Sequence, residues 1–327
     1  MTTTPLQALV SLSDFKRGLN PAQLNQLARE APDPETMIRQ VFGQLTSESD
    51  VLRRKWRKAL TELWTKYHPD IPLLPQLPLT RDQISESYQL LDAVKFIQAV
   101  THNPARLIRQ GRDVMLDPDE ALRIAQTLPS LESTLPTAIE TEWALPQVRR
   151  LRAILESARL IRPYKGQLVP VRSRLSRFMD LTSVQQFFTI WHADVYHVNW
   201  ALFAPAWQPY VAIIQDYLPL LWEVAQPARA HAAASRRAWC QRCIQAFLPL
   251  WDEAGLISPH PRSFAVTLLR QHALPVILNK VVLQDVFARY GLIGFTSSGD
   301  LVWTELGEVL MKAERSGDLP CASHLLN

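Results

Sequence analysis

The sequence predicts a mainly α protein that carries two short β-hairpins, one near residues 160–172 and one near residues 293–304. Apolar side chains recur at helical spacing in several segments, as in helices that pack on a core. The 327 residues include only 10 glycines but 24 prolines, a balance that favours helices with sharp ends. With 47% hydrophobic and 20% charged residues, the chain can bury a sizeable core without disulfides or metals.

A row of prolines divides the N-terminal part of the chain from the rest. Four prolines between residues 69 and 78 are spaced three apart and would share one face of a polyproline II helix. The expected divisions are an N-terminal helical segment, 1–68; a proline-rich connector, 69–79; a helical domain that ends in the first hairpin, 80–180; and an aromatic-rich helical domain that ends in the second, 181–327.

Residues 80–140 are expected to be helical. Within them, Asp117 fits the N-cap of a helix, with Pro118 in its first turn and Glu120 at the capping-box position. A cation site at these acids is less favoured, because a cation bound in a loop takes more oxygen ligands than this segment offers.

The first hairpin is expected to follow a helix that begins at Pro146, a residue suited to the first turn. Two extended stretches around Lys165 and Gly166 then predict the hairpin. The C-terminal region repeats this plan, because Leu151–Met179 and Leu283–Met311 are both 29 residues long. With one residue inserted in the turn, the aligned pairs are Leu160-Ile161 with Leu292-Ile293, Gly166 with Gly299, and Leu168-Val169 with Leu301-Val302.

These patterns resemble known winged helix-turn-helix proteins. Tyr290-Gly-Leu-Ile293 and Trp303-Thr-Glu-Leu-Gly307 are similar to bacterial regulators of the multiple-antibiotic-resistance-repressor type. Leu145-Pro-Gln-Val-Arg-Arg-Leu-Arg152, with Lys165-Gly-Gln-Leu-Val169, resembles helical proteins of unknown function related to the Ri-plasmid ORF-3 family. The first unit departs from the repressor pattern by placing Val171 and Arg174 where Thr and Gly are expected. The resemblance implies two winged-helix-like units.

Charge separates the two copies. Residues 149–177 hold nine basic residues and one acid, a net charge of +8, whereas residues 283–311 hold one basic residue and four acids, a net charge of −3. Because duplex DNA binding depends on neutralising phosphates, only the first unit is suited to it. We expect Arg149, Arg150 and Arg152 to lie toward a DNA groove and Lys165 toward phosphate. The full set of candidate nucleic-acid-binding residues is Arg149, Arg150, Arg152, Arg159, Arg162, Lys165, Arg172 and Arg174.

A second basic helix is expected in the N-terminal segment. Its residues form a solvated face or, alternatively, contact phosphate. They are Arg53, Arg54, Arg57 and Lys58.

The favoured function is that of a DNA-associated, non-enzymatic protein, a transcription regulator or a mobile-element accessory factor whose partner is double-stranded DNA. The alternative is a scaffold or assembly subunit that binds itself, as a homodimer, or another protein through its tryptophan-rich half. Those tryptophans are either the core of a helical domain or an interface, and the sequence leaves both open. They are Trp191, Trp200, Trp207, Trp222, Trp239 and Trp251.

No metal or cofactor is expected. Cys240 and Cys243 have the spacing of half a zinc site, but no second pair of ligands accompanies them. His192 and His197 are five residues apart, which suits one helix face poorly, and a buried polar pair is favoured. Nucleophile-elbow, phosphate-loop, dinucleotide and zinc-protease motifs are absent from the sequence, so an enzyme is the least favoured class.

The chain is expected to be cytoplasmic and to cross no membrane. Three cysteines cannot form a disulfide framework, and the N-terminus lacks the basic flank and apolar block of a signal peptide. Residues 195–215 carry no formal charge, but their prolines and polar residues favour broken, buried helices over a membrane span.

Overall fold

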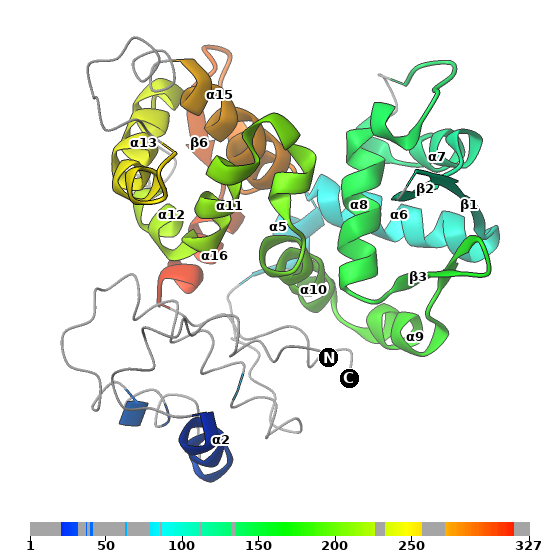
Figure 1. The fold of residues 1–327 in the computed structure, drawn as a ribbon, viewed down its shortest axis with the longest axis horizontal. Coiled ribbons are helices and arrows are strands. Elements are labelled where there is room, and N and C mark those ends of the chain that lie inside the picture. Colours follow the sequence, from blue (N-terminus) through cyan, green and yellow to red (C-terminus); the bar gives the residue numbers. More distant parts are fainter. Residues whose placement is uncertain are drawn as a thin grey trace.

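The computed structural model describes residues 21–31, 37, 40–41, 63, 79–85, 87–111, 113–131, 135–225, 233–256 and 272–316. The chain is mostly helical with small antiparallel sheets, as predicted (Figure 1). The expected second basic helix (Arg53, Arg54, Arg57 and Lys58) and residues 69–78 of the expected connector lie outside the described residues. The first two helices of the described residues are α2 (Pro21–Glu30) and α5 (Arg81–Ser85).

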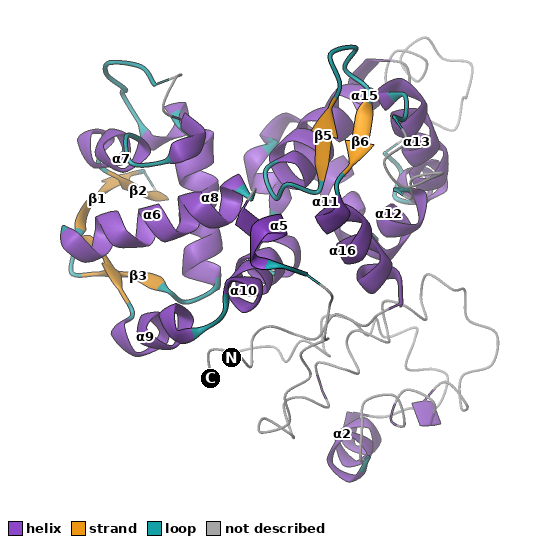
Figure 2. Ribbon diagram, turned by 180° about the vertical axis from the view of Figure 1, so that it is seen from behind, coloured by secondary structure: helices purple, strands orange, loops and turns teal. Residues whose placement is uncertain are grey.

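Residues 88–180 form helices around a four-stranded antiparallel sheet with the strand order β2-β1-β4-β3. Both ribbon views place this sheet at the outer edge of the molecule and α8 on the side that faces the C-terminal half (Figures 1 and 2). In chain order the elements are α6 (Tyr88–His102), β1 (Ala105–Gln110), β2 (Asp113–Leu116), α7 (Pro118–Ala125), η2 (Pro129–Leu131), η3 (Glu142–Ala144), α8 (Pro146–Ser157), β3 (Ile161–Tyr164), β4 (Gln167–Pro170) and α9 (Arg172–Asp180).

The β1–β2 hairpin corrects the expectation that residues 80–140 are helical throughout. Gly111 adopts a φ of 64° between the two strands, a conformation that glycine reaches without steric cost. β1 then pairs with β4 as well as with β2, so non-local pairing stabilises this segment as a strand.

Local signals do place the two helices that follow. The Asp117 side chain accepts a hydrogen bond from the backbone N–H of Asp119, and Pro118 occupies the first turn of α7. Pro146 likewise occupies the first turn of α8, although Leu145 before it provides no side-chain cap. The face of α8 that packs on the core carries the apolar stripe expected from its spacing, namely Val148, Leu151, Ile154 and Leu155.

The C-terminal half ends like the first copy, in a helix, a hairpin and another helix, but among its described residues it has no counterpart of the β1–β2 hairpin. Its two-stranded sheet, β5-β6, is extended by a single bridge between Ala234 and Leu301 of β6, which gives the order Ala234-β6-β5. The elements are α10 (Ser183–Tyr196), η4 (Trp200–Phe203), η5 (Pro205–Trp207), α11 (Gln208–Asp216), α12 (Leu218–Val224), α13 (Arg236–Glu253), α15 (Leu274–Ile277), the π-helix η7 (Leu278–Ala288), β5 (Ile293–Phe295), β6 (Leu301–Trp303) and α16 (Glu305–Ser316).

Equivalent hydrogen bonds support the alignment of the two copies. The backbone N–H of Leu160 donates to Leu155, and that of Leu292 donates to Phe287, so the helix before each hairpin ends in the same motif. After each hairpin, the N–H of Val171 or Thr304 donates back to Leu160 or Leu292. The hairpins themselves lie where the sequence predicts them.

In the second copy the start of α16 lies close against the backbone before β5, a contact for which the first copy does not have the matching residues. The Thr304 hydroxyl donates to the carbonyl of Gly291 and accepts from the N–H of Gly307. A Cβ added at Gly307 would overlap the carbonyl oxygen of Leu292, so only glycine fits there. In the first copy Val171 provides no side-chain cap and Arg174 stands where glycine would be, yet α9 still forms.

One continuous hydrophobic core joins the described residues of both copies. α10 contributes to it by packing against α5, α6 and α8. The six tryptophans between residues 191 and 251 are mainly core residues rather than an exposed interface, because five of them have at most 1% exposure and Trp207 is half-buried. The five are Trp191, Trp200, Trp222, Trp239 and Trp251.

Candidate nucleic-acid interface

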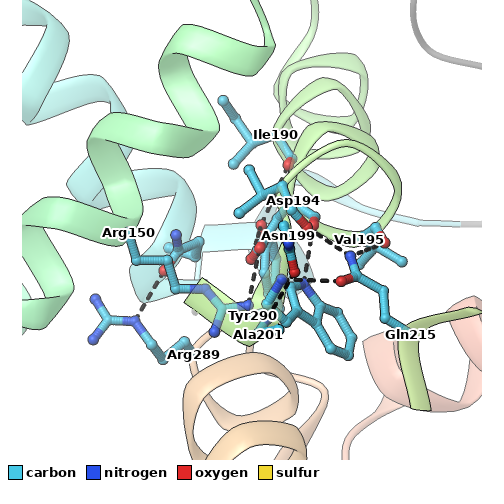
Figure 3. A network of polar contacts seen from close by, with 12 residues as sticks. Arg150, Ile190, Asp194, Val195, Asn199, Ala201, Gln215, Arg289 and Tyr290 are labelled. Atoms are coloured by element: carbon cyan, nitrogen blue, oxygen red, sulfur yellow. Dashed lines mark hydrogen bonds and ion pairs between the residues drawn. The ribbon is translucent and has the colours of Figure 1, made fainter. Parts of the chain in front are cut away.

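Arg150 lies inside the protein, which corrects the expectation that it faces a DNA groove. Its side chain is only 5% exposed and donates to the Oδ1 of Asp194 on α10 at 2.9 Å. Figure 3 shows Arg150, Asp194 and Tyr290 converging from three different elements. The sequence gives no sign of this contact, because Asp194 is 44 residues away along the chain.

Asp194 is the centre of a buried polar network. Its Oδ2 accepts a hydrogen bond from the Tyr290 hydroxyl at 3.1 Å, and its backbone carbonyl accepts one from the Trp200 indole at 3.0 Å. Burial, the largest single effect, lowers the pKa of Arg150, but the charge and hydrogen bond of Asp194, together with Asp285 and Tyr290, outweigh burial and raise the pKa. Burial, reinforced by the Asp194 charge, raises the pKa of Tyr290, so the phenol stays neutral and acts as a donor.

A second buried pair joins the two copies. Arg289, at the end of the π-helix, donates to Asp92 of α6 at 2.9 Å and to the Gln89 amide at 2.9 Å. Burial lowers the pKa of Arg289, and attraction to Asp92 opposes that effect. The two buried ion pairs hold α6 and α8 of the first copy against the C-terminal copy, since separating them would leave uncompensated charge in the core.

Arg152 is also engaged within the protein. Its side chain is 14% exposed, and it pairs with Glu142 at 2.8 Å and with Glu156 at 3.5 Å. It donates a further hydrogen bond to the carbonyl of Val114. Burial raises the pKa of Glu142, although attraction to Arg152 opposes the shift. Arg152 therefore connects α8 to η3 and β2 instead of pointing into a groove.

Arg149 is half-buried beside exposed aromatic and aliphatic side chains. Its guanidinium carbon lies 3.3 Å from the centroid of the Trp143 ring, a cation–π contact, and one nitrogen donates to the carbonyl of Leu202. Burial is the main reason that its pKa is lowered. The three α8 arginines expected at the groove therefore do not form one exposed face, because each of them contacts a different part of the protein.

The remaining candidates, together with Arg177, form what we call the basic surface. It runs from the end of α8 through β3 and β4 to α9, which lies next to β3 in both ribbon views (Figures 1 and 2). Its side chains are exposed except that of Arg174, which is half-buried. The basic surface consists of Arg159, Arg162, Lys165, Arg172, Arg174 and Arg177.

Three arginines of the basic surface lie close enough to repel one another. The pKa of Arg174 is lowered first by burial and then by the charges of Arg159 and Arg177. Like charges held together in this way are unfavourable for the free protein.

The β3–β4 hairpin presents a basic and aromatic face to solvent. Tyr164 pairs with Gln167, which pairs in turn with Arg106 of β1, so these side chains form one row across the sheet. Arg162, two residues before Tyr164, shares that face. The Arg162 guanidinium carbon and the Lys165 ammonium nitrogen lie 5.4 and 5.3 Å from the centroid of the Tyr164 ring. Sequence analysis did not identify Tyr164, whose only signal was its place between two basic residues.

Two residues of the basic surface have unusual backbone conformations. Arg159 has a φ of 56° and Lys165 a φ of 48°, and among the described residues no other non-glycine has a positive φ. Arg159 ends α8 at the position that Gly291 occupies in the second copy. A side chain in this region costs about 1–2 kcal/mol relative to glycine. Both conformations have a local cause, because Arg159 terminates α8 and Lys165 lies in the two-residue turn between β3 and β4.

The other candidate sites are accounted for by packing. Cys240 and Cys243 are buried, and burial raises the pKa of Cys240 to about 11, so its thiol is protonated at neutral pH. His192 is buried next to the ring of His197, whose side chain is exposed. Within the described residues there is no group of three or more His, Cys, Asp or Glu side chains suited to a metal ion. Nor does any helix in the described ranges have the length and apolarity needed to span a bilayer.

No protein-family model, curated protein sequence or solved structure matches this chain. The charge and geometry of the basic surface are therefore the basis of the functional inference.

Proposed function

We propose that this protein is a non-enzymatic nucleic-acid-binding protein that contacts the phosphates of duplex DNA through its basic surface. We also propose that residues 88–180 are a winged helix-turn-helix unit. The order helix, strand, two helices and hairpin is present once β2 is set aside as an additional strand, and it supports this assignment, as does the pairing of β1 with the second strand of the β3–β4 hairpin. The C-terminal copy would be a second such unit that packs against the first.

One observation carries the proposal. Residues 157–179 contain six basic residues and no acid, and they follow the outer edge of the fold from α8 to α9. The α8 arginines differ, because Arg150 and Arg152 are neutralised by Asp194, Glu142 and Glu156. Exposed positive charge suited to an anionic partner is therefore found at the end of α8, on the hairpin and at the start of α9, namely at Arg159, Arg162, Lys165 and Arg172.

This distribution favours contacts to the phosphate backbone over contacts to base edges. α10 and η3 pack against α8 and cover side chains that the sequence placed in a groove. Phosphate contacts position a protein on DNA but carry no sequence information. Four such contacts would give a slope of roughly −4 for the logarithm of the association constant against the logarithm of the salt concentration.

The test is fluorescence anisotropy of a labelled random-sequence duplex at several salt concentrations. The test variant is Arg162→Ala/Lys165→Ala. The control is Arg237→Ala/Arg242→Ala, which removes two exposed positive charges from α13. We expect the test variant to bind more weakly and to reduce the salt slope by about 2, since each phosphate contact contributes about 0.9. The control should behave like the wild type.

Two outcomes would contradict the proposal. The wild-type protein would fail to bind the duplex at low salt, or both double variants would weaken binding equally. Equal weakening would show that net charge alone governs the interaction, with no defined surface. The scaffold alternative has lost its main support, because the tryptophans on which it rested are in the core.

A further inference from the structure

We propose that Tyr164 is a stacking site for an unpaired nucleobase, so that the β3–β4 hairpin binds single-stranded nucleic acid more selectively than duplex. This inference rests on the proposed function, because the basic surface supplies the phosphate contacts on either side of the base. Phosphate contacts alone do not distinguish single-stranded nucleic acid from duplex, whereas a site that stacks on an unpaired base does.

The first support is the exposure of the ring. Tyr164 is 50% exposed at the end of an edge strand. Its cross-strand neighbour is Gln167, an exposed amide, so no apolar side chain faces it across the hairpin. The buried residues of the hairpin, Ile161 and Leu168, lie on the other face of the sheet. Packing within the fold therefore leaves much of the Tyr164 ring accessible to a ligand.

The second support is the surroundings of the ring. Arg162 and Lys165 place positive charge near it, as a nucleotide requires when its base stacks and its phosphates lie alongside. Gln167 offers both a donor and an acceptor next to the stacked base. Arg106 continues the row across β1, although it also pairs with Asp117 at 2.7 Å.

The conformation of the ligand decides which nucleic acid fits. In a duplex, both faces of each internal base are covered by neighbouring base pairs. A ring projecting from the hairpin can then reach only a groove or a duplex end. In a single strand the faces are open, and stacking on an aromatic side chain tolerates any base. The Tyr164 site should therefore add affinity for single strands that duplex DNA does not receive.

The experiment compares a labelled 20-nucleotide single strand of random sequence with the corresponding duplex, using the full chain at low salt. The variants are Tyr164→Ala and Tyr164→Phe. The matched control is Tyr88→Ala, since Tyr88 on α6 is 53% exposed and outside the basic surface. We expect Tyr164→Ala to weaken single-strand binding by roughly 5- to 150-fold, the range measured for loss of one stacked base. Tyr164→Phe and Tyr88→Ala should bind like the wild type.

A second readout reports contact directly. A single strand containing 5-iodouracil is irradiated with the protein, and the cross-linked residue is mapped by mass spectrometry. We expect cross-links at Tyr164 in the wild type, cross-links at the same position in Tyr164→Phe, and their loss in Tyr164→Ala.

The outcomes separate this inference from the proposed function. Salt-dependent binding of both ligands that Tyr164→Ala leaves unchanged would overturn the stacking site while leaving phosphate binding intact. Equal weakening of duplex and single-strand binding by Tyr164→Ala would overturn the selectivity for single strands. Failure of the wild type to bind either ligand would overturn both proposals.

Discussion

The buried position of Arg150 gives the sharpest prediction about this fold. Replacing Arg150 with Met keeps much of the side-chain volume but removes the charge that pairs with Asp194. Asp194 has no exposed surface, and its only other side-chain partner among the described residues is the neutral hydroxyl of Tyr290. Arg150→Met would therefore leave a carboxylate in the core without its counter-charge.

The expected loss is large compared with the stability of an ordinary domain. Breaking a buried ion pair by removing one partner costs about 3–5 kcal/mol, whereas a domain is stable by about 5–15 kcal/mol. Asp194→Asn should cost a similar amount, because it leaves Arg150 buried and charged. The double variant Arg150→Met/Asp194→Asn removes both charges. Its loss of unfolding free energy should be about 2–3 kcal/mol smaller than the sum of the losses in the two single variants.

Urea unfolding followed by tryptophan fluorescence measures these losses, since six buried tryptophans among the described residues report on the core. The same variants are titrated with duplex DNA under conditions in which each is folded. If Arg150 is structural, folded Arg150→Met binds DNA like the wild type. Unchanged stability together with lost DNA binding would refute the placement of Arg150 in the core and restore it to the DNA interface.

Two further predictions concern backbone positions. Arg159→Gly should raise the free energy of unfolding by about 1 kcal/mol, because it removes the cost of a positive φ, and it should also weaken duplex binding. A variant that loses stability or keeps full affinity would contradict the role given to Arg159. Gly307→Ala should destabilise the protein by about 1–3 kcal/mol because the added Cβ overlaps the Leu292 carbonyl. Gly294→Ala should not show this loss, because its added Cβ has no atom within 4 Å. Equal urea midpoints for these two variants would refute the close approach at Gly307.

Sequence reasoning succeeded where the cause of a structure is local. Asp117 and Pro118 start α7, and Pro146 starts α8, because caps and proline rings act on the backbone next to them. The turn at Lys165 and Gly166 was found for the same reason. The alignment of the two copies also held, since Leu160 and Leu292 close equivalent helix ends.

The β1–β2 hairpin was missed because its stability is not local. The sequence of β1, Ala-Arg-Leu-Ile-Arg-Gln, is compatible with a helix, and its strand pairing depends on β4, more than fifty residues later. Gly111 was a signal that sequence reasoning did not use. A glycine between two apolar stretches is consistent with a turn, but only the pairing with β4 makes the strands favourable.

The sequence by itself determined how much positive charge the first copy carries and that its apolar stripes would make it mainly helical. Only the tertiary structure decided which of those charges face solvent. Arg150 meets Asp194 from 44 residues away, and Tyr290 reaches the same carboxylate from 96 residues away. Composition fixes the number of charges, but packing fixes their partners, because an ion pair in the core depends on which helices meet there. For that reason the candidate site moved from α8 to the β3–β4 hairpin and α9.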